Sequence, residues 1–200
     1  MSRFPDTPVT LLARLASDIT GRSEAQWTQL IELYRPTMVK FAESLGAKSS
    51  AEDIVQDVLV SLVSSIRRGG YNAKLGKFHS YLAASIRNRI INWRDSERSR
   101  GADGRASLGG AVEAAAAVPP EAPAVIDAKW RLACRAAAMG HVLTKTALAA
   151  RTKDIYRAYV IDGRPIGDVA KEFGVSRNVV AQAKTRIESM IAGYEKMLAE

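Results

Sequence analysis

Six side chains near the carboxyl end of the chain could bind a nucleic acid through hydrogen bonds and charge. They follow Gly174 and Val175 and are Ser176, Arg177, Asn178, Gln182, Lys184 and Arg186. Asn, Gln and Arg can pair with base edges in the major groove of DNA, whereas Lys and Arg can contact phosphates. We expect base contacts from Arg177, Asn178 and Gln182. Lys184 is expected to contact phosphate whatever the base sequence.

These side chains need a helix to carry them, because a helix about 10–12 Å across fits the major groove. The sequence predicts two short helices joined by a tight turn. Pro165 suits the first turn of the first helix, Gly174 permits a left-handed turn, and Ser176 caps the second helix. The residues expected on the inner side of the second helix are Val179, Val180, Ala183 and Ile187. A plain helical hairpin with a solvated charged face is the alternative to a DNA-binding helix-turn-helix.

The overall composition fits a folded basic protein. The 200 residues are 47% hydrophobic and carry a formal net charge of +8, so a polyanion is the first partner to consider. Cys134 is the only cysteine, which excludes an intramolecular disulfide and favours a reducing compartment. No apolar stretch approaches the ~20 residues that span a bilayer. We therefore expect a cytoplasmic protein without a membrane span.

The middle of the chain is expected to be a flexible linker. Residues 99–124 are rich in Ala, Gly and Pro and offer few large apolar side chains, so they cannot bury enough surface to offset their ordering entropy. This divides the chain into residues 1–98, the linker 99–124 and residues 125–200. No alternating strand pattern of useful length occurs. The predicted fold is all-α, with two small helical domains joined by the linker and a helix-turn-helix in the second.

The helices of the first domain follow from apolar spacing. One is expected from Glu24 to about Leu45, kinked or broken at Pro36. A second covers residues 51–68, and Ser50 with Asp53 approximates a capping box at its start. Its apolar stripe is Ile54, Val55, Val58, Leu59, Leu62, Val63 and Ile66. A third begins near Phe78 or Ser80, with Phe78, Leu82, Ile86 and Ile90 toward the core.

The second domain is expected to open with an alanine-rich helix from Ile126 to about Leu148. A further helix covers the stretch RTKDIYRAYVIDG, and Gly163 ends it. The helix-turn-helix follows directly.

Three motifs in this order resemble bacterial sigma factors of the extracytoplasmic-function class. They are AEDIVQDVLVSLVSSIRR, then GKFHSYLAASIRNRIINWRDSER, and, after the linker, RTKDIYRAYVIDGRPIGDVAKEFGVSRNVV. The resemblance runs from Trp27 to the carboxyl end, except for the linker. It implies that the partners are core RNA polymerase, through its β′ clamp and β subunits, and promoter DNA. Many members are also held by an anti-sigma factor, and their linker runs toward the RNA exit path.

The resemblance also implies site residues. The helix matching Ala51 to Arg67 would dock on the coiled coil of the β′ clamp, with an acidic and polar face made of Asp53, Gln56, Asp57 and Val60. The next helix and the loop before it would read and open the minus-ten promoter element. The residues suited to phosphates and unpaired bases there are Asn72, Lys74, Lys77, His79, Tyr81, Arg87, Asn88 and Asn92. The helix-turn-helix would bind the minus-thirty-five element.

The second helix of the helix-turn-helix departs from the family pattern. Where common members carry basic residues, this chain has Ala181 and Ala183, and its cations Lys184 and Arg186 come one turn later. We therefore expect docking in the groove to be rotated, or weighted toward phosphate contacts.

Other classes of function fit the sequence less well. GGYNAKLGKF fails as a phosphate loop, because Gly70 and Gly76 are separated by five residues and Phe78 stands where Ser or Thr is needed. His79 and His141 lack metal-ligand spacing, and no nucleophile has an evident base. We predict no enzymatic activity, no metal and no cofactor. A dimeric helix-turn-helix regulator and a protein-only adaptor remain as alternatives, and the role of residues 1–22 stays open.

Overall fold

The computed structural model describes Leu12, Leu15 and residues 24–68, 77–102 and 122–199. Every element in these ranges is helical, which confirms the all-α prediction. None of the helices described is both long enough and apolar enough to cross a membrane. The predicted site residues Asn72 and Lys74 lie outside the described residues, as does most of the predicted linker.

The chain groups into two compact units that meet between Ala133 and Cys134. Unit 1 contains α2 (Glu24–Ser44), the short 3-10 helix η1 (Lys48–Ser50), α3 (Ala51–Arg67) and α4 (Phe78–Ala102). The division falls inside α5 (Pro123–Lys145), so the first half of this helix belongs to unit 1 and the second half to unit 2. The predicted domain bounds 1–98 and 125–200 stay a prediction.

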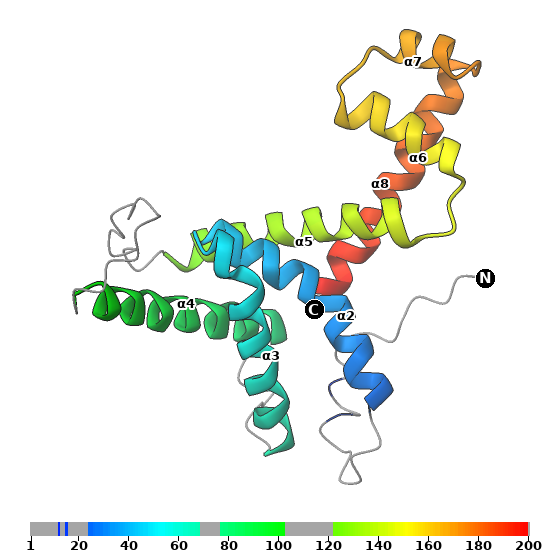
Figure 1. Ribbon diagram of the computed structural model, residues 1–200. Coiled ribbons are helices and arrows are strands. Elements are labelled where there is room, and N and C mark those ends of the chain that lie inside the picture. The colour runs from blue at the N-terminus through cyan, green and yellow to red at the C-terminus, as the bar shows by residue number, and fades with distance from the viewer. Residues whose placement is uncertain (1–11, 13–14, 16–23, 69–76, 103–121, 200) are drawn as a thin grey trace. The chain divides into compact units, whose positions relative to one another are not determined.

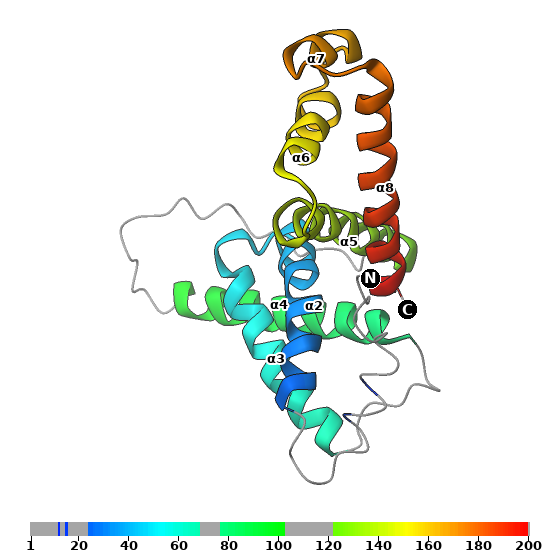
Figure 2. The same ribbon diagram turned by 90° about the vertical axis from the view of Figure 1, so that its right-hand side faces the viewer.

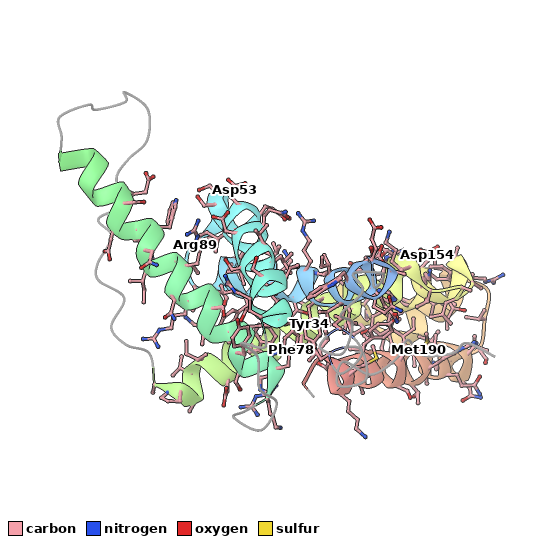
Figure 3. The ribbon with its side chains drawn as sticks, turned by 90° about the horizontal axis from the view of Figure 1, so that it is seen from below. Tyr34, Asp53, Phe78, Arg89, Asp154 and Met190 are labelled. Carbon is pink, nitrogen blue, oxygen red and sulfur yellow. The ribbon has the colours of Figure 1, made fainter. Side chains whose placement is uncertain are left out.

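The three long helices of unit 1 pack against one another through one apolar face each (Figure 1). On α2 the expected inward residues Trp27, Leu30, Tyr34, Met38 and Phe41 are all buried. Pro36 lies within α2 and does not end it, so the expected break is absent from this helix. The ring of Tyr34 meets that of Phe78 on α4 edge to face, with centroids 5.1 Å apart (Figure 3).

The stripes predicted for α3 and α4 are also buried, except for Val63, which is half-buried. The buried residues on α3 are Ile54, Val55, Val58, Leu59, Leu62 and Ile66, and those on α4 are Phe78, Leu82, Ile86 and Ile90. Each such side chain contributes about 1.5–3 kcal/mol when it leaves water. The expected capping box is wrong, because the side chain of Ser50 makes no capping hydrogen bond to α3.

Arg94 joins the end of α2 to α4. Its Nη2 donates a hydrogen bond to the backbone oxygen of Leu45, at 2.6 Å. The next residue, Gly46, has φ of +90°, in the region that favours glycine, and a Cβ at this position would lie 2.9 Å from Arg94 Nη2. The turn after α2 therefore depends on both residues.

Unit 2 contains the second half of α5, α6 (Ala150–Tyr156), the π-helical turn η3 (Arg157–Ile161), α7 (Ile166–Glu172) and α8 (Arg177–Ala199). Figure 2 shows α8 running beside α6, with α7 packed near its start. Gly163 has φ of +65° and ends the helical stretch, as predicted. One apolar cluster joins α5, α6 and α8 and contains Ala138, Val142, Leu143, Tyr156, Ile187 and Ile191. A second joins α6, η3, α7 and α8 and contains Ile155, Ala158, Val169, Ala170, Val180 and Ala183.

A polar network fixes α8 to α5 and α6. The hydroxyl of Tyr156 donates a hydrogen bond to Glu188 Oε1 at 2.7 Å, and Arg135 Nη2 donates one to Glu188 Oε2 at 2.8 Å. Burial, followed by the bond to Glu188, raises the pKa of Tyr156 to about 12. The hydrogen bond from Tyr156 is the largest cause of the lowered pKa of Glu188.

Replacement Tyr156→Phe is expected to lower the free energy of unfolding by about 1 kcal/mol at neutral pH. Because the pKa of Glu188 is lowered in the folded chain, its contribution is present above the unfolded pKa and is lost as pH falls through the folded pKa. The difference between Tyr156→Phe and the parent chain should therefore shrink in acid. Urea unfolding followed by circular dichroism at neutral and acidic pH measures it. A difference that is equal at both pH values contradicts the assigned role of Glu188.

Candidate functional site

The expected polymerase-binding residues form one exposed surface on α3. Asp53, Gln56, Asp57 and Val60 are all exposed and lie opposite the buried stripe of the helix, and we refer to them as the α3 face. Val60 is 58% exposed, which is unusual for an apolar side chain of that size. The α3 face thus combines carboxylates, an amide and an accessible apolar group.

The two carboxylates of the α3 face differ in their surroundings. Arg89 of α4 forms an ion pair with Asp57, with its Nε 3.0 Å from Oδ2, and Figure 3 shows Arg89 on the side of α4 near α3. Asp53 has no ion-pair partner among the residues that the structure describes. Sequence reasoning missed Arg89, because the pair joins residues 32 positions apart and no local pattern marks it.

On α4, the structure separates the expected DNA-binding residues into exposed and packed groups. Lys77, Asn88 and Asn92 are exposed, and the two amides lie one turn apart on the same side of α4. Arg87 and Tyr81 are half-buried, and the ring of Tyr81 stacks on that of Phe78 with centroids 6.5 Å apart. Lys77 and the two amides are therefore the accessible hydrogen-bonding groups of this set.

His79 is packed within unit 1. Its ring stacks on that of Trp130, with centroids 6.2 Å apart and planes 26° apart. Trp130 is 2% exposed and also meets Phe41 of α2 edge to face at 5.2 Å. Sequence reasoning assigned Trp130 to the domain that begins at residue 125, whereas these contacts belong to unit 1. The predicted role of His79 in holding an unpaired base is not tested by these contacts.

The turn between α7 and α8 has the predicted geometry. Gly174 has φ of +59°, and the Oγ of Ser176 accepts a hydrogen bond from the backbone N–H of Val179 at 3.3 Å. Val175 is half-buried and packs against the cluster that joins α6, η3, α7 and α8. These contacts fix the direction in which α8 leaves the turn.

The burial of α8 decides which of its side chains can reach a partner. Val180, Ala183 and Ile187 are buried as predicted, but Val179 is 40% exposed, so its expected inner position is wrong. Asn178, Gln182 and Arg186 follow one another at intervals of four residues and are all exposed. We refer to them as the outer ridge of α8.

Sequence reasoning missed Thr185 beside the outer ridge. Its Oγ1 donates a hydrogen bond to the backbone oxygen of Ala181 at 3.1 Å, so the hydroxyl proton is used within the helix. Thr185 comes seven positions after Asn178 and three after Gln182, so helical periodicity alone predicts that it lies on the side of α8 that carries these amides.

The other two predicted cations, Arg177 and Lys184, lie on one edge of α8. They stand seven positions apart, which places them on the same side of the helix. The guanidinium of Arg177 lies close to α7 at Gly167, and Lys184 Nζ lies 5.8 Å from the ring centroid of Tyr159. This edge is distinct from the outer ridge.

The remaining candidate groups of unit 2 belong to its packing. Cys134 is buried, and burial raises the pKa of its thiol to about 12, so the thiol is protonated at neutral pH. His141 forms a hydrogen bond with the hydroxyl of Tyr194, and burial lowers the pKa of His141. Among the described residues no three His, Cys, Asp or Glu side chains gather as metal ligands would.

Comparison with known proteins gives one match. Residues 30–100 match the family model of Sigma-70 region 2, just over a third of the chain, which includes most of α2, all of α3 and nearly all of α4. Neither a curated protein nor a solved structure is detectably similar to the chain. The match supports a sigma factor of the sigma-70 family, a protein that acts with RNA polymerase in promoter recognition.

Proposed function

We propose that the chain is an extracytoplasmic-function sigma factor that binds core RNA polymerase and directs initiation at particular promoters. Unit 1 binds the polymerase and reads and opens the minus-ten element, and the helix-turn-helix of unit 2 binds the minus-thirty-five element. The observation that carries the proposal is the occurrence, in one chain, of a Sigma-70 region 2 match at residues 30–100 and of two helices, α7 and α8, that are joined by the Gly174 turn and carry the exposed outer ridge.

The α3 face is the proposed contact with the β′ clamp. Asp53 and Asp57 supply negative charge in a chain whose formal net charge is +8, so this surface suits a basic partner helix. Gln56 adds a hydrogen-bonding group, and the exposed Val60 adds apolar area. Arg89 holds Asp57 in place, which leaves Asp53 as the carboxylate most available to a partner.

The amino end of α4 and its outer side are the proposed minus-ten surface. Lys77 is exposed beside the start of α4 and suits a backbone phosphate, while Asn88 and Asn92 offer donors and acceptors to base edges. Tyr81, half-buried on Phe78, has a supported ring on which a base could stack. The proposal retains Asn72, Lys74, His79 and Arg87 as further contacts.

The outer ridge of α8 is the proposed reader of the minus-thirty-five element. Its two amides and one guanidinium match the donors and acceptors of base edges in the major groove. The Gly174 turn and the Ser176 cap hold α7 and α8 in a fixed relation, as groove docking requires. We also propose the β subunit of RNA polymerase and an anti-sigma factor as partners. The proposed location of the chain is the cytoplasm.

Transcription with purified core RNA polymerase and a genomic DNA library tests the proposal as a whole. We expect discrete new start sites only when the full chain is present, and strand opening that requires both components. A dimeric regulator would instead bind its operator without polymerase, and an adaptor would show no salt-dependent DNA binding. Failure of the chain to associate with core polymerase, or association without defined start sites, contradicts the proposal.

Charge reversal at Asp53 tests the α3 face. Asp53→Lys is expected to weaken core polymerase binding about tenfold, or about 1.4 kcal/mol, because a favourable charge contact becomes repulsive. Asp57→Lys is less informative because it also breaks the ion pair with Arg89. Glu32→Lys, an equal charge reversal on the exposed side of α2, is the control. Equal core affinities of the two variants, measured by fluorescence titration, would rule out the assignment.

Substitutions on α8 test base reading. Asn178→Ala and Gln182→Ala are each expected to change the preferred upstream bases, with a cost of about 1–3 kcal/mol at the affected base pair. Lys184→Ala is expected to weaken all sequences alike and to reduce the salt slope by about one. Selection of promoters from a random library by the polymerase complex separates the two outcomes. Unchanged base preference in both amide variants would contradict the outer ridge as the reader.

A further inference from the structure

Arg177 and Lys184 are held by residues of neighbouring elements. They stand seven positions apart, so they share one edge of α8 about 10 Å apart along its axis. Asn178, Gln182 and Arg186 occupy the neighbouring outer ridge. The helix therefore carries Arg177 and Lys184 on a different side from its amides and Arg186.

Gly167 leaves room for Arg177 beside α7. A Cβ at Gly167 would lie 3.3 Å from Arg177 Nη2 and 3.7 Å from Nε. The guanidinium thus lies over the backbone of α7, where a larger residue would crowd it. Gly167 is inside α7, where glycine is a weak helix former. Its lack of a side chain lets the guanidinium of Arg177 lie close to the backbone of α7.

Tyr159 provides the support for Lys184. The ammonium lies 5.8 Å from the centroid of the tyrosine ring, within the range of a cation–π interaction. The ring itself is half-buried and packs against the apolar cluster that includes Ile155, Val169 and Val180. Because the core holds the ring, the ring restricts where the lysine side chain can lie.

We propose that Gly167 and Tyr159 are positioning residues, which hold Arg177 and Lys184 as a preset edge for the sugar-phosphate backbone of duplex DNA. The proposal rests on the proposed function of unit 2 as a DNA-binding unit. It reassigns Arg177 from base reading to backbone contact and leaves Asn178, Gln182 and Arg186 to the bases. Phosphate contacts set the register of a protein on the duplex, and side chains that are already restricted lose less freedom on binding.

The edge explains how α8 can dock with alanine at positions 181 and 183. Ala183 is buried in the core of unit 2 and Ala181 presents only a methyl group, so neither supplies charge. The cations are instead Arg177, one turn before Ala181, and Lys184, directly after Ala183, and the residues next to these cations come from α7 and η3. Three separate elements therefore define one basic edge.

Salt-dependent binding of the full chain to a fluorescent 30-base-pair duplex of mixed sequence tests the proposal, with the length chosen as roughly three helical turns. Each phosphate contact contributes about 0.9 to the slope of log K against log salt. Arg177→Ala and Lys184→Ala are therefore each expected to reduce the slope by about that amount. Tyr159→Leu should lower affinity about two- to fivefold and reduce the slope partly, whereas Tyr159→Phe, which keeps the ring, should retain both.

Two further variants separate positioning from folding. Tyr159→Leu should have no added effect in the Lys184→Ala background, since the ring then has no ammonium to hold. Gly167→Ala improves helix propensity and should keep the fold, yet its Cβ would lie 3.3 Å from Arg177 Nη2, so the guanidinium must shift and the slope should fall by less than in Arg177→Ala. If Tyr159→Leu does not fold, Gly167→Ala still tests whether a neighbouring residue positions a cation of α8. Tyr194→Leu, on α8 beside His141, is the matched control and should leave the slope unchanged.

The outcomes distinguish the two proposals. If the double variant Arg177→Ala/Lys184→Ala binds the duplex as the parent chain does, unit 2 does not contribute to DNA binding and its proposed function fails. If that double variant loses affinity but Gly167→Ala and Tyr159→Leu keep the parent slope, the positioning roles are overturned and the DNA-binding role stands. An equal effect of Tyr159→Leu with and without Lys184 also overturns the role of the ring.

Discussion

The burial of one apolar stripe on each helix is the constraint on which the other features depend. On α8, Val180, Ala183 and Ile187 are held in the core, so the side chains on the opposite side must face outward. The same argument on α3 turns Asp53 and its neighbours away from the Ile54 stripe. A change that rotated either helix by one residue would bury these polar groups and expose the stripe, at a cost of several kcal/mol.

Local spacing was enough to predict most of this framework. The stripes of α3 and α4, the left-handed Gly174 and the Ser176 cap all follow from residues within one or two turns of each other, and all were predicted from the sequence. The prediction for Val179 is wrong because its apolar character favours an inner position, whereas its angle on the helix, about 100° from Val180, turns it outward. Ser50 was placed wrongly as half of a capping box because the 3-10 turn of η1 precedes α3.

Contacts between residues distant in sequence could not be predicted in this way. The pairing of Arg89 with Asp57, of Trp130 with His79 and of Lys184 with Tyr159 each depends on which helix faces which. A periodic pattern reports only whether a residue points inward or outward. It was therefore possible to predict that Asp57 and Lys184 are exposed, but not that each has a neighbour that restricts its side chain. Those neighbours decide how available each charge is to a partner.

The distribution of charge indicates that the proposed surfaces have different roles. A chain of net charge +8 is drawn to nucleic acid along much of its surface, and such attraction does not distinguish one sequence from another. The α3 face, where Asp53 is exposed without an ion pair among the described residues, opposes that attraction and favours a basic protein surface. On α8, the proposal assigns affinity to Arg177 and Lys184 and base choice to the exposed amides. The proposed function needs the α3 face and the amides of α8 as well as the net charge, because charge alone would bind the chain to DNA without selecting a sequence.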